Sequence, residues 1–214
     1  MAVICPSILA TDEEQYRRQM EKVAGFAHRI QIDLTDGKFA ASKTVKPEGA
    51  WWPVGIKADF HLMYEDPRLA VKVISEHRPN MIIVHAEAKG DFETFSNYCA
   101  HYGIKVGIAL LPKTNPARIE PALPKIDHVL IFSGNLGHYG GYANQNLLHK
   151  VSYLKSKKPQ LEIGWDGGVN EQNISHLASG GIDVFVVGAV IHEADNPARV
   201  FHRLQRIADE TGTT

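Results

Sequence analysis

Three side chains that can transfer protons or bind a metal ion, Asp33, His61 and Asp166, each stand at the end of a different short apolar run. Carboxylates and imidazoles are costly to bury without partners, so several of them at one rim indicate a metal site or acid/base catalysis. Any one of them alone would be most simply a solvated residue or a strand-end cap. Their convergence from separate runs favours a metal site or acid/base catalysis over these structural roles. The same kind of position also holds Ser7, Asp36, Asp59, His85, Glu87 and Ser133.

Glycines gather after the last three apolar runs, as the pairs Gly140–Gly141 and Gly167–Gly168 and the single Gly188. Glycine lets backbone N–H groups approach a phosphate closely, and barrels often bind phosphate near their seventh and eighth strands. One Gly-Gly pair is more often only a turn, but three neighbouring clusters favour a phosphate site. The sequence contains no GxxxxGK[ST], HExxH or GxSxG motif, and no GxGxxG between a strand and a helix.

These residues need a scaffold that brings many strand ends together. β-branched or apolar runs, each followed by a turn and then mostly by an amphipathic stretch, begin at Val3, His28, Ile56, Met81, Lys105, His128, Leu161 and Ile182. Helix signals stand between them: Asp12 caps a helix from Glu13 towards Val23, Pro67 and Asn170 each precede one, and Pro197 opens the last. The stretch from Gly37 to Pro53 is too polar and broken for a helix and is expected to be a loop. The pattern predicts an α/β fold, a single (β/α)8 TIM barrel over residues 1–214, with a doubly wound open sheet as the alternative.

Composition excludes several classes of protein. Apolar residues make up 44% of the chain, which is enough for a core and argues against disorder. Lys and Arg number 23 against 24 Asp and Glu, so the net charge of −1 argues against a nucleic-acid partner. No apolar run is long enough to span a membrane, and the amino-terminal stretch lacks the basic start of a secretory signal. Cys5 and Cys99 form no disulfide framework, so a cytoplasmic location is expected.

Several motifs, in their order along the chain, resemble the ribulose-phosphate 3-epimerase family of phosphate-binding barrels. CPSILA at 5–10 is similar to the family's first strand, and QIDLTDGKF at 31–39 to its H-x-D-x-M-D-G-x-F. DFHLM at 59–63 matches D-x-H-L-M, HAE at 85–87 matches H-x-E, TNP at 114–116 resembles the turn after the fifth strand, and WDGGVN at 165–170 resembles D-G-G-I/V-N. The similarity covers nearly the whole chain, from Cys5 to about Pro197.

The resemblance implies a ketose-phosphate 3-epimerase, in the first place one that interconverts D-ribulose 5-phosphate and D-xylulose 5-phosphate through an enediolate. Asp33 and Asp166 would be the acid/base carboxylates and would hold one divalent metal ion (Mn, Zn, Fe or Mg) together with His61 and a second histidine. A bound cation would stabilise the charge that builds on the carbonyl oxygen. The substrate, a small sugar phosphate, would be bound by Ser7, His61, Met63, Gly140, Gly141, Gly167, Gly168, Gly188 and Ala189. A homo-oligomer is possible, with Trp51, Trp52 and Pro53 as either a subunit contact or ordinary core packing.

The chain departs from the family pattern at several positions. Gln31 replaces the first histidine of the metal set, and its amide oxygen is a weaker donor that suits Mn or Mg better than Zn. Thr35 replaces a methionine and is expected to make the pocket more polar, and Ala189 replaces a serine. The loop from Ser133 to Gln145 is longer than the family's, and its His138 is either a solvated residue or a substitute imidazole.

These departures leave two alternatives open: an epimerase of a hexulose phosphate, or a non-catalytic sugar-phosphate-binding barrel with an incomplete metal site. A decarboxylase of the orotidine-phosphate type fits poorly, because the Asp-x-Lys-x-x-Asp strand is missing.

Overall fold

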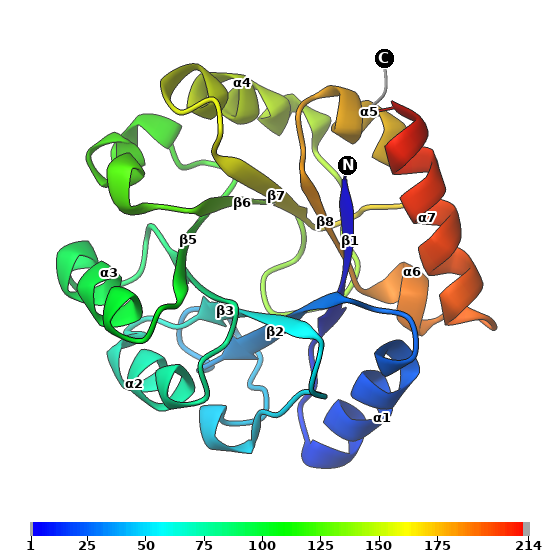
Figure 1. The fold of residues 1–214 in the computed structure, drawn as a ribbon, viewed down its shortest axis with the longest axis horizontal. Coiled ribbons are helices and arrows are strands. Elements are labelled where there is room, and N and C mark those ends of the chain that lie inside the picture. The colour runs from blue at the N-terminus through cyan, green and yellow to red at the C-terminus, as the bar shows by residue number, and fades with distance from the viewer. Residues whose placement is uncertain (1, 212–214) are drawn as a thin grey trace.

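Eight short apolar runs form eight parallel strands that close into a barrel in the computed structural model, which describes residues 2–211 (Figure 1). The strands follow one another round the barrel in chain order, and β1 pairs with β8 to close it. Their bounds are β1 Val3–Ile8, β2 Arg29–Thr35, β3 Lys57–Met63, β4 Met81–His85, β5 Lys105–Leu110, β6 His128–Phe132, β7 Glu162–Asp166 and β8 Val184–Val187. The predicted (β/α)8 barrel is confirmed, and the open doubly wound sheet is excluded.

Helices cover the outside of the barrel, as Figure 1 shows. They are α1 Glu13–Ala24, α2 Arg68–Glu76, α3 Phe92–His101, α4 Leu148–Lys157, α5 Ile174–Ser179, α6 Ala189–His192 and α7 Pro197–Thr211, with 3-10 helices η1 Pro47–Gly49, η2 Pro116–Lys125 and η3 Gln145–Leu147. Asp12 caps α1 as predicted, because its side chain accepts a hydrogen bond from the backbone N–H of Gln15. The predicted loop from 37 to 53 holds only η1, so β2 and β3 are joined without an α-helix.

Two connections differ from the sequence-based expectation. The segment between β5 and β6 is the 3-10 helix η2, whose Pro121 and Pro124 lack the N–H groups that an α-helix would need. The helix predicted directly after Asn170 begins only at Ile174, because the side chains of Asn170 and Asn173 bond to nearby backbone N–H groups and hold a turn there.

Alternation along each strand divides the core in two. Outward-facing side chains such as Ile30, Ile32 and Leu34 of β2 pack beneath the helices in one large apolar group. A smaller apolar group fills the inside of the barrel and consists of Cys5, Met81, Ile83, Ala109, Leu130, Val184 and Val186. The inward-facing residues of β2 are the polar ones, so the sequence places Gln31 and Asp33 inside the barrel.

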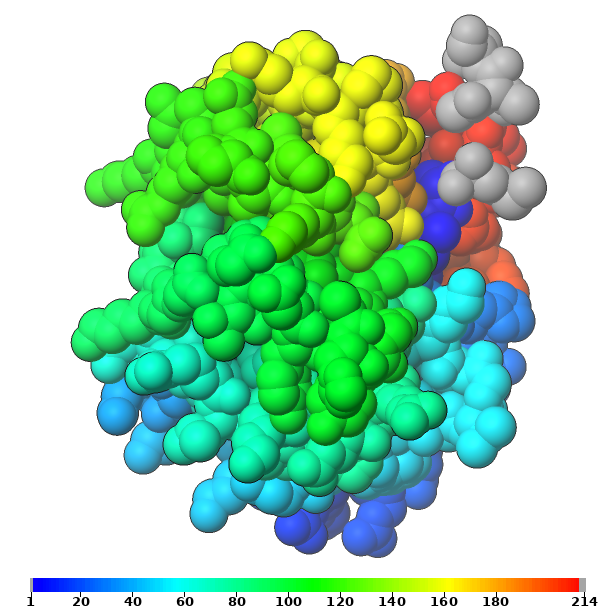
Figure 2. All heavy atoms as spheres, turned by 60° about the vertical axis from the view of Figure 1, so that its left-hand side comes forward, coloured from blue at the N-terminus to red at the C-terminus, as the bar shows by residue number. Residues whose placement is uncertain are grey.

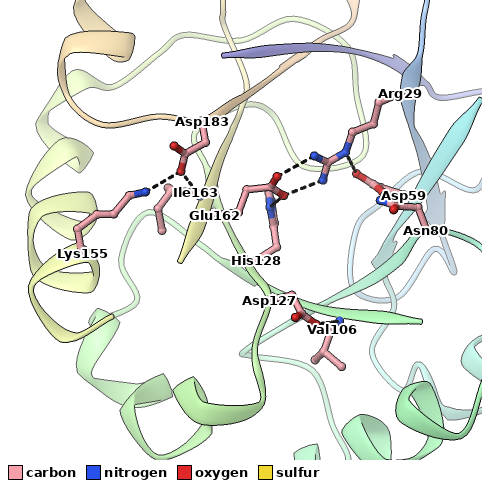
Figure 3. Close-up of polar contacts among 10 residues, drawn as sticks. All are labelled: Arg29, Asp59, Asn80, Val106, Asp127, His128, Lys155, Glu162, Ile163 and Asp183. Carbon is pink, nitrogen blue, oxygen red and sulfur yellow. Dashed lines mark hydrogen bonds and ion pairs between the residues drawn. The ribbon is translucent and has the colours of Figure 1, made fainter. Parts of the chain in front are cut away.

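A buried ion cluster lies near the amino-terminal ends of the strands (Figure 3). Arg29, the first residue of β2, donates a hydrogen bond of 2.5 Å from Nε to Asp59. Its two Nη atoms donate further hydrogen bonds of 2.8 and 2.9 Å to the carboxylate of Glu162 in β7. His128 of β6 lies 2.7 Å from the same glutamate. The expectation that Asp59 lies at the carboxyl-terminal rim with His61 is therefore wrong, because Asp59 belongs to this lower cluster.

The apolar loop residues Trp51 and Trp52 pack mainly on their own chain. Trp52 stacks edge-on against Phe60, with ring centroids 5.5 Å apart, and Trp51 lies against Tyr16 at 5.9 Å while 44% of its surface stays exposed. Core packing thus accounts for Trp52, and an oligomer remains a prediction. Among residues 2–211, no helix has the length and apolar character that crossing a membrane requires.

Candidate active site

Two carboxylates and an imidazole converge at the carboxyl-terminal end of the barrel. Asp33 and His61 are register neighbours on β2 and β3, and Asp166 is the last residue of β7. One ligand atom from each lies within 4.8 Å of the others. Asp33 and His61 are buried, and the Asp166 side chain is 15% exposed. The predicted convergence of these three side chains is what the structure shows.

Gln31 joins the two carboxylates. Its Nε2 donates to Asp33 Oδ1 and to Asp166 Oδ2, both at 2.8 Å, and lies 3.4 Å from Nδ1 of His61. This orientation follows from the hydrogen-bond network, because the amide oxygen in the same place would face two carboxylate oxygens. Gln31 faces the site as predicted, but with its donor end rather than with the oxygen that a metal ion needs.

The three converging side chains fit a divalent cation chemically. Two carboxylates and an imidazole are ordinary ligands for such ions, and their donor atoms already lie close together. Gln31 can add an oxygen only if its carboxamide turns over and gives up both hydrogen bonds. Asp33, His61 and Asp166 can therefore bind a cation as they stand. Gln31 can do so only by breaking its hydrogen bonds to the two carboxylates.

Asp166 has an unusual acidity. Burial, reinforced by the negative charge of Asp33, raises the pKa of Asp166 to about 7, while His61 and the Gln31 hydrogen bond oppose the rise. A carboxyl group with such a pKa holds a substantial share of its proton at neutral pH, and a general acid needs that property.

A second histidine lies behind the first. Nε2 of His61 is 2.9 Å from Nε2 of His85, the last residue of β4. Nδ1 of His85 is in turn 3.4 Å from Oε2 of Glu87. Burial lowers the pKa of His85 to about 4, so its ring is neutral at physiological pH. His85 and Glu87 of the HAE motif thus lie at the rim expected from the sequence, behind His61.

A pocket of about 130 Å³ opens beside the carboxylates. It is lined by Asp33, Asp166 and all but one of the predicted substrate-binding residues, namely Ser7, Met63, Gly140, Gly141, Gly167, Gly168, Gly188 and Ala189. His61 is the exception, because it is fully buried beneath Asp33. The pocket therefore joins the glycine clusters to the acid/base pair.

The glycines also bring the loops around this pocket into close contact. A Cβ on Gly167, which has φ +113°, would lie 2.0 Å from the backbone nitrogen of Gly134. A Cβ on Gly188 would lie 2.4 Å from the ring of Tyr139. Glycine is therefore required here by packing alone, whether or not the backbone N–H groups bind a phosphate.

Tyr139, in the long loop after β6, is a site residue that sequence reasoning missed. Its hydroxyl accepts from the backbone N–H of Leu9 at 2.8 Å and lies 2.8 Å from Oε1 of Gln19, to which it can donate. The ring packs against His192 with centroids 5.5 Å apart. The hydroxyl thus ties the long loop to the end of β1. Its only sequence signal was its place directly before Gly140–Gly141.

Several other candidates have structural roles. The carboxylate of Asp36 accepts from the backbone N–H groups of Lys38, Phe39 and Glu65 and so shapes the loop after β2. Ser133 closes its loop by donating to the Tyr142 carbonyl and accepting from the Asn144 N–H. The expectation that Thr35 makes the pocket polar is wrong, because its hydroxyl donates to the Ser42 carbonyl instead. His138 is exposed at the pocket mouth, as a solvated loop histidine would be.

A larger cavity of about 390 Å³ lies outside the barrel between α2, α3 and η2. These three elements lie on the side of the molecule that faces the viewer in Figure 2. Its walls are mainly apolar and include Val84, Ile108, Phe92, Phe95, Tyr98 and Ile119. Neither carboxylate of the site lines it. The smaller pocket beside Asp33 and Asp166 is therefore the candidate active site.

Comparisons with known proteins agree with this geometry. The model of the ribulose-phosphate 3 epimerase family matches residues 3–192. A ribulose-phosphate 3-epimerase of Helicobacter pylori is 28% identical over 211 residues, which cover 95% of this chain and 97% of the relative. One from Aquifex aeolicus is 31% identical over 202 residues, with 91% of each chain covered.

Solved structures support the fold alone, because their sequence identity is low. The 3-hexulose-6-phosphate synthase of Salmonella typhimurium superimposes with a TM-score of 0.72 at 13% identity, over 98% of this chain and 99% of that one. A KGPDC of Streptococcus mutans gives a TM-score of 0.70 at 10% identity, over 99% of each chain.

Proposed function

The chain belongs to the ribulose-phosphate 3-epimerase family, and from this premise we propose that it interconverts D-ribulose 5-phosphate and D-xylulose 5-phosphate. The observation that carries the proposal is that Asp33 and Asp166 both lie 2.8 Å from one atom, Nε2 of Gln31. Inversion at a carbon beside a carbonyl needs a base on one face and an acid on the other. Two carboxylates aimed at one point from different strands can supply both.

Each of the two carboxyl groups would take part in one of the two proton transfers. Asp33 as the base takes the proton from C3, and the electron pair of the C3–H bond moves towards the C2 carbonyl to give an enediolate. Asp166, whose pKa is raised by burial and by the charge of Asp33, donates its proton to the opposite face of C3. The reverse reaction exchanges these roles. Return of the proton from Asp33 to Asp166 readies the site for the next forward turnover.

Asp33, His61 and Asp166 would hold a divalent cation, and Gln31 would add its Oε1 after its carboxamide has turned. Such a cation, when bound, stabilises the negative charge that develops on the sugar oxygens. An oxygen-rich donor set favours Mn²⁺ or Mg²⁺ over softer ions. The amide bridge competes with this binding, so we expect the cation to be held less tightly than by a histidine at position 31.

The pocket beside the carboxylates would take the rest of the substrate. The glycines in its wall would let backbone N–H groups approach a phosphate closely. Ser7 would hydrogen-bond near the reacting carbon, and Met63 would line the sugar-binding part, since both residues line the pocket. Because the Thr35 hydroxyl is bonded to its own loop, nothing at that position favours a hexulose phosphate over a pentulose phosphate.

The test is incubation of the purified protein with D-ribulose 5-phosphate in deuterated water, with chelator or with added Mn²⁺, Mg²⁺, Zn²⁺ or Fe²⁺, followed by NMR at C3. We expect deuterium at C3 and formation of D-xylulose 5-phosphate. Asp33→Asn should abolish both, and Asp166→Asn should abolish the formation of D-xylulose 5-phosphate, while each variant stays folded. Parallel incubation with a hexulose 6-phosphate measures the preference between substrates.

Binding shifts without exchange under every cation would contradict the proposal and leave a sugar-phosphate-binding barrel. Faster exchange at C3 of a hexulose phosphate would contradict the assigned substrate but not the reaction. Full activity of Asp166→Asn would remove the assigned acid/base pair.

A further inference from the structure

His85 is buried and Glu87 is half-buried, and no proton transfer proposed above uses either residue. His85 is 3% exposed, and the Glu87 side chain is 20% exposed. They form a row with His61 that runs from the outer part of the rim to the carboxylates: Glu87, His85, His61, Asp33. The row thus connects Glu87 to His61 through the ring of His85.

The row contains two atoms that lack any hydrogen bond. Within residues 2–211, Nδ1 of His85 and Oε2 of Glu87 are both buried and unbonded, yet they lie only 3.4 Å apart. A small adjustment of either side chain makes them a hydrogen-bonded pair. An ionised carboxylate can only accept, so the shared proton belongs on Nδ1 of His85.

Placing that proton determines every other proton of the row. A neutral imidazole carries one N–H and one lone pair, so Nε2 of His85 is then an acceptor. Nε2 of His61 lies 2.9 Å away and must be the donor. Nδ1 of His61 is left with its lone pair, and it points at Asp33 Oδ1 at 2.9 Å and at Asp166 Oδ2 at 3.6 Å.

The opposite order of protons also leaves two acceptors facing each other, at His85 instead of at His61. If His61 carried its proton on Nδ1 and donated to Asp33, Nδ1 of His85 would present a lone pair to the Glu87 carboxylate in a buried place. Two facing acceptors are costly there, because neither has water to bond. A cation beside Nδ1 of His61 relieves the conflict at the other end of the row, so Glu87 and a bound cation favour the same arrangement.

Glu87 is held firmly enough to act in this way. Its other oxygen, Oε1, accepts from the backbone N–H of Leu111 at 3.2 Å and from the hydroxyl of Thr114. The His85 ring is held by Phe39, whose ring centroid lies 4.6 Å away. The row is therefore fixed at its outer end by the segment after β5.

We propose that Glu87 and His85 are positioning residues that fix the tautomer of His61, so that Nδ1 offers its lone pair to a divalent cation shared with Asp33 and Asp166. Outer hydrogen bonds of this kind orient metal-binding histidines in general. The inference rests on the cation site of the proposed function and goes beyond it by assigning roles to His85 and Glu87 of the HAE motif.

Glu87→Gln is the sharpest test, because it keeps Oε1 for Leu111 and Thr114 but offers His85 an N–H₂ donor. The whole row can then reverse and place a proton on Nδ1 of His61. We expect the dissociation constant for Mn²⁺, measured by EPR and calorimetry without substrate, to rise about 10–100-fold. Glu65→Gln is the matched control, since Glu65 is a rim glutamate paired with Lys89 at the surface, and it should leave Mn²⁺ binding unchanged.

The tautomers can also be read directly in the unaltered protein. Long-range ¹H–¹⁵N NMR of the protein loaded with diamagnetic Mg²⁺ should show the proton of His85 on Nδ1 and that of His61 on Nε2, with each ring assigned from the corresponding His→Gln variant. Glu87→Gln should move the His61 proton to Nδ1, which a merely structural role would not do.

A His61 proton on Nδ1 in the unaltered Mg²⁺-loaded protein would overturn the inference, as would unchanged Mn²⁺ affinity in Glu87→Gln or no Mn²⁺ binding by the unaltered protein. These readouts do not involve substrate. A protein that binds Mn²⁺ and shows the expected tautomers, but does not epimerise, would therefore refute the proposed reaction and leave this inference intact.

Discussion

Replacing Asp166 with asparagine should stabilise the cation-free protein at neutral and alkaline pH. Burial and the charge of Asp33 raise the pKa of Asp166 from its ordinary value of 3.8 to about 7. The folded protein therefore holds this proton more tightly than the unfolded chain does. As pH rises from about 4 to about 7, the unfolded chain loses the proton first, and the folded state loses stability relative to it.

The size of the effect follows from the pKa difference. About three pKa units at about 1.4 kcal/mol each amount to at most about 4 kcal/mol, reached near pH 7 and constant above it. Asparagine has no such charge and retains an oxygen for the hydrogen bond from Gln31, although a bond to a neutral acceptor is weaker by about 1 kcal/mol. We therefore expect Asp166→Asn to gain about 2–4 kcal/mol above pH 7 and nothing near pH 4.

Urea unfolding in the presence of chelator, at pH values from 4 to 8.5, measures this difference. The exposed Asp195→Asn is the matched control and should show no comparable pH dependence. Mn²⁺ at a thousand times its dissociation constant should cancel or reverse this difference, because a ligand that binds only the folded state then adds about 4.1 kcal/mol. If Asp166→Asn is no more stable than the unaltered protein at pH 8 without cation, the two carboxylates do not repel each other as the structure indicates.

Three further substitutions test other parts of the molecule. Gln31→His should tighten Mn²⁺ binding about tenfold or more in calorimetry, and an unchanged affinity would mean that position 31 does not reach the cation. Gly167→Ala should cost about 1–3 kcal/mol or more in urea unfolding and weaken sugar-phosphate binding, because its Cβ would lie 2.0 Å from the Gly134 nitrogen; unaltered stability would disprove the close contact. Arg29→Met should cost about 3–5 kcal/mol by leaving the buried Asp59 and the half-buried Glu162 without their cation, while Mn²⁺ binding by the remaining folded protein stays intact.

The barrel could be predicted because its signals are local. Eight apolar runs with turns between them gave the strands to within a residue or two, since each strand buries its own side chains. The predictions failed where side chains compete with the backbone. Asn170 and Asn173 delay the start of α5, and Pro121 and Pro124 prevent an α-helix after β5.

Asp59 shows the limit of periodicity in predicting a site. Asp59 and His61 are two residues apart on β3, so both point into the barrel, but they differ in height by about 6–7 Å. Period-two alternation fixes the face of the strand and not the level within the barrel. The level depends on where the neighbouring strands begin, and β2 begins with Arg29, which binds Asp59 at the lower end.

The orientation of Gln31 could not come from sequence for a related reason. Its position two residues before Asp33 predicts only that both side chains face inward. Asp166 determines which end of the amide faces the carboxylates, and this residue lies on β7, more than a hundred residues further along the chain. With two acceptors on one side, the amide must donate. The same group would have to present its oxygen to a cation, so Gln31 makes the cation-free site more stable and cation binding weaker through the same two hydrogen bonds.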